Sequence, residues 1–359
     1  MTTDLHKTLF VWCVSVLFLG FTSAQRHHDT HTIVSFGIVT DVHYADVPPL
    51  GNRIFRDSLP KMQDALRSIT NANASFVIEL GDFKDTDTTY WECNKNPSPG
   101  CINLTVGYLQ QIESVFRKGF DGPHFHVLGN HDVDILNQST VLANEVIEIE
   151  VDTGSLGAYS WQWPPYTSRP PLRFIVLNGD YTNADVPWSD LDLPFPGESW
   201  DKANIPTFQL TWLAEQLESA VAFNQKVVVF VHNRLDGGPG GPVNCSNATK
   251  CGQLNNRAWV DACTLENAAV VRDVLEAHSG LVLATFSGHD HVPHPPFSQE
   301  RVGKPIYWTH AGMVEGYHNN SNAYSVVEIE SDCTIVVRGF ANATSARILG
   351  PDGCRIERV

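Results

Sequence analysis

The sequence predicts an α/β (α+β) fold built on a mixed sheet, or on two packed sheets, with helices outside. Short apolar runs with strand character alternate with helical stretches over most of the chain, whereas consecutive strand-like runs fill its last part. The 359 residues include 42% hydrophobic side chains, which is ordinary for a globular protein with a substantial core. We expect one domain over residues 25–359, because strands continue on both sides of the Gly- and Pro-rich stretch at residues 235–247.

The individual elements follow from periodicity and from turn residues. Strands are predicted at residues 31–40, 75–80, 125–128, 173–178, 226–231, 281–286, 305–310, 323–330 and 333–340. Helices are predicted at residues 57–71, 105–118, 207–221 and 264–278. In the third helix, leucines and a valine recur at spacings of three and four, which is typical of an amphipathic helix. Thr207, which follows Pro206, is expected to cap that helix.

The first 24 residues have the pattern of a secretory signal peptide. Lys7 precedes an apolar stretch at residues 9–21, and small residues follow up to Ala24, the expected cleavage site. The alternative is a membrane anchor, but the apolar stretch is shorter than the roughly 20 residues that span a bilayer. We therefore expect a secreted protein, or one in the lumen of the secretory and endolysosomal system, with no membrane anchor after cleavage.

Cysteines and glycosylation motifs agree with that compartment. The cysteines that remain after cleavage are Cys93, Cys101, Cys245, Cys251, Cys263, Cys333 and Cys354. Candidate disulfides are Cys93–Cys101, Cys245–Cys251 or Cys245–Cys263, and Cys333–Cys354, and the odd count leaves one thiol unpaired. The sequon N-x-S/T, which predicts N-glycans, occurs at Asn73, Asn103, Asn137, Asn244, Asn247, Asn319 and Asn342. The net charge of −16 and the scattered basic residues argue against a nucleic-acid partner.

Five of the predicted strands end in side chains of types that are able to bind metals. These residues are Asp41 and His43, Asp82 and Asp85, Asn130 and His131, His232, and finally His289 and His291. Each alone is more often a turn or packing residue, but loops after strands are where α/β proteins place their sites. Imidazole and carboxylate together suit zinc, iron and manganese. The ordered set therefore predicts a metal site.

The segment SGHDH carries two of these histidines. Side chains two residues apart on a strand share a face of the sheet. We therefore expect His289 and His291 to point the same way, and Asp290 to point the other way and bind no metal.

The ordered motifs D-x-H, G-D-x-x-D, G-N-H-D, H and G-H-x-H resemble those of the calcineurin-like metallophosphoesterases, over residues 36–291. The resemblance implies a four-layer α-β-β-α sandwich of two packed mixed sheets, with the metal site at the loops after the strand carboxyl ends. It also implies two divalent ions, which we expect to be manganese, zinc or iron. One ion would be held by Asp41, His43, Asp82 and His291. The other would be held by Asp82, Asn130, His232 and His289, with Asp82 bridging.

The resemblance also implies a reaction on a small phosphorylated substrate. Two divalent ions would offset the charge of a phosphate ester and lower the pKa of a shared water, whose hydroxide would attack phosphorus. His131 is the family's candidate for protonating the leaving oxygen, and Asp85 is expected to orient the His131 ring. Arg53 and Arg56 are expected either to grip a substrate phosphate or to brace their loop through ion pairs.

The surrounding segments indicate a branch of the family. GDFKD lacks the tyrosine that ligates ferric iron in purple acid phosphatases. FGIVTDVHYAD, GNRIFRDSLPKMQDAL and PIYWTHAGMVEGYHNNSNAYSVVEI are similar to segments of the manganese-dependent ADP-ribose/CDP-alcohol diphosphatases, which often have Gln at the position of His43. The secretory context and His43 favour a phosphomonoesterase. Cleavage of nucleotide diphosphate linkages, as in ADP-ribose or CDP-alcohols, is the alternative. A non-catalytic metal-binding glycoprotein ranks below both, because every ligand position is filled.

Overall fold

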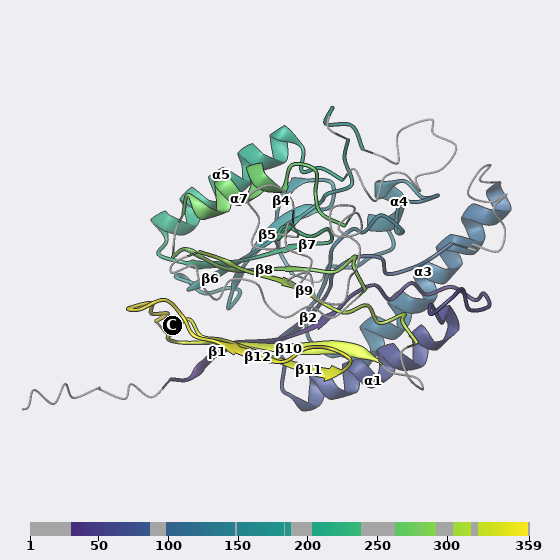
Figure 1. Ribbon diagram of the computed structural model, residues 1–359, viewed down its shortest axis with the longest axis horizontal. Helices are drawn as coiled ribbons and strands as arrows, with labels where there is room; N and C mark the ends of the chain where they lie inside the picture. Colours follow the sequence, from purple (N-terminus) through teal and green to yellow (C-terminus); the bar gives the residue numbers. More distant parts are fainter. Residues whose placement is uncertain are drawn as a thin grey trace, which may run out of the picture. The chain divides into compact units, whose positions relative to one another are not determined.

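Two six-stranded mixed sheets form the framework of the fold (Figure 1). They lie within the compact unit that spans His31–Val359. The computed structural model describes residues 30–86, 98–147, 149–182, 184–187, 203–237, 263–278, 280–291, 304–316 and 322–357. The predicted signal peptide, Asn244, Asn247, Asn319 and the cysteines Cys93, Cys245 and Cys251 lie outside the described residues.

The first sheet has three parallel strands and an antiparallel extension. β1 (Thr32–Val39), β2 (Phe76–Glu79) and β3 (His124–His126) run parallel. On the other side of β1 the sheet continues through the antiparallel strands β10 (Ala323–Glu330), β11 (Ile335–Ala341) and β12 (Ala346–Ile348).

The second sheet has the same mixed character. β6 (Leu172–Leu177), β7 (Lys226–Val231), β8 (Val282–Ser287) and β9 (Ile306–Thr309) are parallel neighbours. β5 (Ala158–Trp163) and β4 (Asp152–Ser155) extend it in antiparallel fashion. The carboxyl ends of the parallel strands are thus available in both sheets to carry a site.

Three apolar cores define four layers. The core between the sheets is aromatic: Phe36 stacks on Phe76 at 4.9 Å between ring centroids, and Phe125 stacks on Trp161 at 3.7 Å. The first sheet packs its other face on α1 (Ser58–Asn71) and α3 (Pro99–Gly119), and the second packs on α5 (Thr207–Ala222) and α7 (Ala268–Glu276). The short helices are η1 (Phe55–Asp57) and α4 (Gln138–Leu142). The predicted four-layer sandwich is confirmed.

Several local predictions differ from the structure. β4, β5, β12 and α4 were not predicted, because they are short or rich in polar and aromatic residues. α3 begins earlier than expected, since Ser98 caps it by accepting a hydrogen bond from Cys101 N at 3.2 Å. Thr207 was expected to be a cap, which is wrong. Pro206 is the N-cap residue, and the Thr207 N–H donates instead to Asp185 Oδ1 at 2.9 Å.

The cysteine predictions have mixed outcomes. The disulfide Cys333–Cys354 is present and ties the C-terminal segment to the turn between β10 and β11. Cys263 is a buried free thiol, so the alternative pair Cys245–Cys263 is wrong. Cys101 is also disulfide-bonded, and the predicted Cys93–Cys101 pair involves a residue outside the described ranges.

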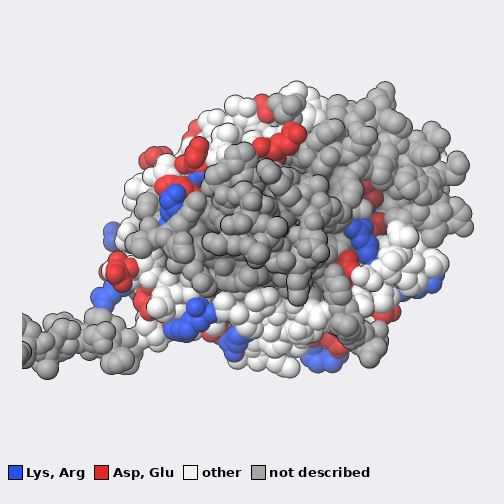
Figure 2. Space-filling view, viewed as in Figure 1, with Lys and Arg blue, Asp and Glu red and all other residues white. Residues whose placement is uncertain are grey.

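The surface of the described residues shows no large basic patch on the face in Figure 2, where Lys and Arg side chains are interspersed with Asp and Glu. Among the helices formed by the described residues, none combines the length and apolar character needed to cross a bilayer.

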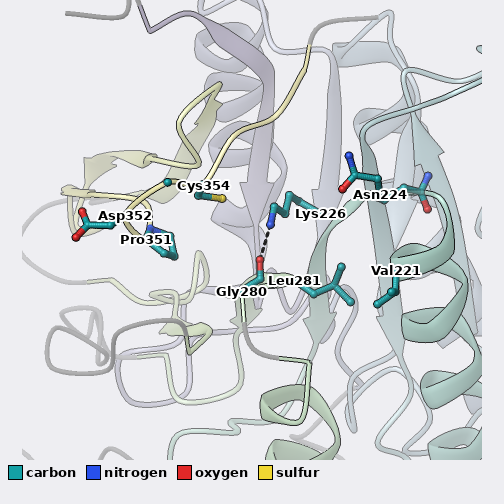
Figure 3. A pocket seen from close by; sticks show the side chains of 10 residues that line it. Val221, Asn224, Lys226, Gly280, Leu281, Pro351, Asp352 and Cys354 are labelled. Carbon is teal, nitrogen blue, oxygen red and sulfur yellow. Dashed lines mark hydrogen bonds between the residues drawn. The ribbon is translucent and has the colours of Figure 1, made fainter. Parts of the chain in front are cut away.

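A hollow of about 400 Å³ lies at the amino end of β7, beside the C-terminal segment that contains Pro351 and Cys354 (Figure 3). Lys226 Nζ donates there to Gly280 O at 2.6 Å. The length of β7, roughly 20 Å, separates this hollow from His232, which follows the other end of the strand. The hollow is therefore separate from the predicted metal site.

Candidate metal centre

The loops after β1, β2, β3, β7 and β8 bring the predicted ligands together. Hydrogen bonds between neighbouring loops continue past the strand ends, from Asp41 N to Gly81 O at 3.0 Å and from His43 N to Asp82 O at 2.8 Å. A further bond joins the two sheets, because His289 N–H donates to the Asp41 carboxylate at 3.0 Å. The site is therefore held at the seam between the sheets.

Five of the ligand residues have left-handed backbone conformations. Their φ angles are 50° at Asp41, 46° at His43, 57° at Asp82, 69° at His289 and 59° at His291. Such conformations cost about 1–3 kcal/mol each outside glycine and persist only where the surroundings hold them. β8 ends at Ser287, so His289 and His291 converge through these turns. The strand alternation expected for SGHDH is therefore the wrong reason for their common direction.

Two glycines allow the loops to approach so closely. A Cβ atom on Gly81, whose φ is +99°, would lie 2.5 Å from His232 Nδ1. A Cβ atom on Gly129 would lie 2.3 Å from Asp82 N. Any larger residue at either position would push a ligand loop out of place.

Asp41, His43, Asp82 and His291 form the first ligand group, and all four are buried. Their metal-facing atoms lie within 4.8 Å of one another. His43 Nε2 and His291 Nε2 are only 2.9 Å apart. Each of the two rings has its Nδ1 against a carboxylate, at 2.9 Å from Asp85 Oδ2 for His43 and 2.8 Å from Glu315 Oε1 for His291.

Those contacts fit a bound cation. If each Nδ1 donates its hydrogen to its carboxylate, both Nε2 atoms present lone pairs to the same point. Two facing lone pairs are satisfied by a metal ion, and a carboxylate behind each ligand histidine is the usual arrangement in metal sites.

Asp82, His232 and His289 form the second group. His232 Nε2 lies 3.2 Å from Asp82 Oδ2 and 3.1 Å from His289 Nδ1, while His232 Nδ1 is 2.8 Å from Leu80 O. Asn130 Oδ1 is buried without a hydrogen-bond partner among the described residues, and His232 Nε2 and His289 Nδ1 face each other. A second cation would satisfy such atoms.

One oxygen of Asp82 faces both groups. Asp82 Oδ2 lies 3.4 Å from His43 Nε2 and 3.2 Å from His232 Nε2. The other oxygen, Oδ1, accepts a hydrogen bond from His131 N at 2.8 Å. The geometry therefore places Asp82 where a bridging ligand would lie and puts His289 and His291 in different groups, as expected from the sequence.

His131 lies beside the first group with its side chain 22% exposed. Its Nδ1 is 3.7 Å from Asp85 Oδ1 and 3.9 Å from Asp134 Oδ2. Burial lowers the pKa of His131, but the charges of Asp85 and Asp82 outweigh burial, so the pKa is raised above its ordinary value. Asp85 was expected to orient His131. The structure shows its closer contact with His43, so this carboxylate serves both rings.

Two further carboxylates support the site. Glu315, on the loop after β9, was missed in the sequence, although it follows a strand end like the other site residues. Asp132 accepts hydrogen bonds from the backbone N–H groups of Asp82, Phe83, Lys84 and Gly129. Asp132 thus holds the β2 and β3 loops together.

Asp290 contributes to the architecture of the site through a different contact. Its carboxylate pairs with the guanidinium of Arg234, which also pairs with Asp236 at 2.8 Å. All three side chains are buried. Asp290 thus belongs to neither of the two ligand groups.

Arg53 and Arg56 have different surroundings. Arg56 is exposed and pairs with Asp46 at 2.6 Å, so it braces its loop. Arg53 is half-buried, and its side chain forms no hydrogen bond or ion pair with the described residues. Burial lowers the pKa of His43 to about 4, and the positive charge of Arg53 acts in the same direction on His43, His131 and His291. A backbone bridge between Arg53 and Glu315, whose carboxylate contacts the His291 ring, places Arg53 near the first ligand group.

Comparisons with known proteins agree with this geometry. The model of the calcineurin-like phosphoesterase family matches residues 34–293. Manganese-dependent ADP-ribose/CDP-alcohol diphosphatases from Oryza sativa subsp. japonica and Arabidopsis thaliana are each 26% identical over 291 residues. Both alignments cover 72% of this chain, with 78% of the rice protein and 80% of the Arabidopsis protein.

A solved structure has the same fold. A dimetal phosphatase from Danio rerio superposes with a TM-score of 0.64 at 18% identity, covering 89% of this chain and 100% of that chain. Manganese dependence in the named relatives and the two ligand groups support divalent metal ions as cofactors. With the family model matching most of the chain and the ligand motifs gathered at one edge of the sheets, the chain belongs to the calcineurin-like phosphoesterase family and is a hydrolase of phosphoric ester bonds.

Proposed function

We propose that this enzyme hydrolyses the diphosphate linkage of small nucleotide compounds such as ADP-ribose or CDP-alcohols. The observation that supports it is the similarity to diphosphatases over 72% of the chain. The sequence had favoured a phosphomonoesterase. That ranking is replaced, because the relatives support the alternative instead.

When bound, two divalent ions would offset the negative charge of the diphosphate and lower the pKa of the attacking water. The residues that would hold them are Asp41, His43, Asp82 and His291 for one ion, and Asp82, Asn130, His232 and His289 for the other. Asp85 and Glu315 fix two of the ligand rings through their Nδ1 atoms.

His131 and Arg53 are suited to the leaving group. Cleavage of a diphosphate releases a phosphate monoester, whose second pKa is about 6. This phosphate leaving group is stable as an anion, so offsetting its negative charge matters more than transferring a proton to it. A protonated His131 ring and the unpaired Arg53 guanidinium both supply positive charge beside the ligand groups.

A substrate panel tests the proposed function. With Mn²⁺, the protein should convert ADP-ribose to AMP and ribose 5-phosphate, and should hydrolyse p-nitrophenyl phosphate with a lower kcat/KM. Asp82→Asn should lower kcat/KM for ADP-ribose by at least about 100-fold, because even an outer residue of a metal site contributes 10- to 100-fold. A protein that turned over the monoester well and left ADP-ribose intact would refute the diphosphatase proposal and leave the family assignment standing.

Arg53 and Arg56 offer a matched pair of variants. Arg53→Ala should raise KM for ADP-ribose by about 10- to 100-fold, the effect of losing a hydrogen bond to a charged group. Arg56→Ala should change KM by no more than about twofold, since Arg56 forms an exposed ion pair. Steady-state kinetics of both variants, with Arg53→Lys as a partial rescue, measure the difference. Equal KM values for the two alanine variants would show that Arg53 does not contact the substrate.

Glu315 and Asp290 are buried carboxylates beside ligand histidines, and they should behave differently. Glu315→Gln should weaken Mn²⁺ binding by about 10- to 100-fold, because it removes the acceptor of the His291 ring. Asp290→Asn should leave Mn²⁺ affinity nearly unchanged and lower the free energy of unfolding by about 3–5 kcal/mol, because it leaves Arg234 partly unpaired. Calorimetric Mn²⁺ titration and urea unfolding separate the two effects. Loss of metal affinity in Asp290→Asn would contradict the assignment.

We propose in addition that the protein enters the secretory pathway. The leader pattern at residues 1–24, the disulfide Cys333–Cys354 and the exposure of Asn73, Asn103 and Asn137 support this. Expression in a eukaryotic cell line should give protein in the medium that begins at Gln25 and loses mass on treatment with an N-glycosidase. Retention in the cytosol with an intact leader would oppose it.

A further inference from the structure

A second cluster of potential ligands lies apart from the two ligand groups, on the helix-facing side of the first sheet. Glu79 ends β2, His126 ends β3, and the two residues are register partners on adjacent parallel strands. Glu145 reaches the same place from the segment after α4. Ligand atoms of the three side chains lie within 4.8 Å of one another.

The cluster is deeply buried in apolar surroundings. Glu79 is 0% exposed, His126 is 3% exposed and Glu145 is 7% exposed. The rings of Phe83 and Phe116 pack against the His126 ring at 5.4 Å and 5.2 Å between centroids. Water therefore has little access to these three polar groups.

Most of their polar atoms lack a partner. Both ring nitrogens of His126, both carboxylate oxygens of Glu145 and Glu79 Oε1 form no hydrogen bond among the described residues. Glu79 Oε2 is satisfied by Gly81 N at 2.9 Å, and the His126 backbone is satisfied by the Tyr159 hydroxyl. The unsatisfied atoms are therefore those that face one another. Leaving several such atoms unpaired is costly for a folded protein.

The charges around the cluster are mainly negative. Burial raises the pKa of Glu79 and of Glu145 well above the usual value, and the charge of Asp132 acts in the same direction on both. Glu145 also faces Glu113, whose Oε2 lies 3.4 Å from His126 Nε2. The hydrogen bond from the Gly81 amide and, after it, the charge of His232 oppose the rise in the pKa of Glu79. No lysine or arginine among the described residues forms an ion pair with Glu79 or Glu145.

We propose that Glu79, His126 and Glu145 bind a third divalent cation, of the zinc or manganese class, in a structural role. His126 Nδ1 lies 3.4 Å from Glu79 Oε1 and 4.0 Å from Glu145 Oε1. Two ligand atoms about 2.1 Å from a tetrahedral zinc ion lie about 3.4 Å apart, so small adjustments would complete the site. One imidazole and two carboxylates suit zinc and manganese.

The cation would brace the strands that carry catalytic loops. β2 leads directly to Asp82, β3 leads to Asn130 and His131, and Glu79 also holds the Gly81 amide. Glu113 lies on the Nε2 side of His126, where it would fix the tautomer that leaves Nδ1 free for the ion. The site would thus join two strands, α3 and the segment after α4, without contacting substrate.

Metal counting tests the proposal without relying on activity. The full-length protein is loaded with Mn²⁺ and Zn²⁺, and unbound metal is removed by gel filtration. Elemental mass spectrometry then gives the number of metal ions per chain. We expect three ions per chain in the parent and two in Glu145→Gln, which preserves shape and removes a charged ligand. His291→Ala should lose an ion from the catalytic pair while retaining the third.

A parent protein with two ions overturns the proposal and indicates that protons neutralise the cluster instead. Three ions in a folded Glu145→Gln variant also overturn it, because the third ion would then lie elsewhere. If Glu145→Gln does not fold, the count in the parent decides, together with Glu113→Gln, which should retain three ions under loading and release the third to a chelator about 10- to 100-fold more readily. Failure of the diphosphatase proposal would appear in the substrate panel and would leave these counts unchanged.

Discussion

The arrangement of the metal centre depends on Asp82, which is bonded through nearly every polar atom that it has. Its backbone N–H donates to Asp132, its backbone carbonyl accepts from His43, and its Oδ1 accepts from His131. The remaining oxygen faces both ligand groups. A left-handed residue with four directional contacts has no freedom to turn away. The two groups therefore keep a fixed separation, which is the condition for two ions to act on one phosphate.

Much of this fold was predictable because the parallel strands are short apolar runs that end in polar residues. The same pattern located the ligand residues, since a chain with five such strand ends must bring them to the edges of its sheets. β4 and β5 escaped prediction because DTGS and AYSWQW lack a clear apolar alternation. Glu315 was not predicted as a site residue, because its role depends on a contact with His291 that no local sequence pattern reveals.

The two histidines of SGHDH show where local reasoning reached a correct result by a wrong route. Strand alternation would give them a common face, but the strand has ended and each residue adopts a left-handed turn. The turns are held from outside, by the Asp41 carboxylate on His289 N and by the Gly312 N–H on His291 O. Sequence spacing cannot supply such tertiary restraints. Likewise the sequence favoured a monoesterase partly because of His43, whereas the structure shows its ring between Asp85 and His291, within the first ligand group.

Cation binding would offset both the backbone strain of the ligand residues and the cost of burying the carboxylates. Each left-handed ligand residue costs about 1–3 kcal/mol, and each uncompensated buried carboxylate adds a desolvation penalty. A cation that binds only the folded chain raises the free energy of unfolding by about 4 kcal/mol at a concentration 1,000-fold above its Kd. The Glu79–His126–Glu145 cluster lies at the carboxyl ends of β2 and β3, and the loops that follow these strands carry Asp82 and Asn130. A cation bound there would therefore couple folding of the first sheet to assembly of the catalytic centre.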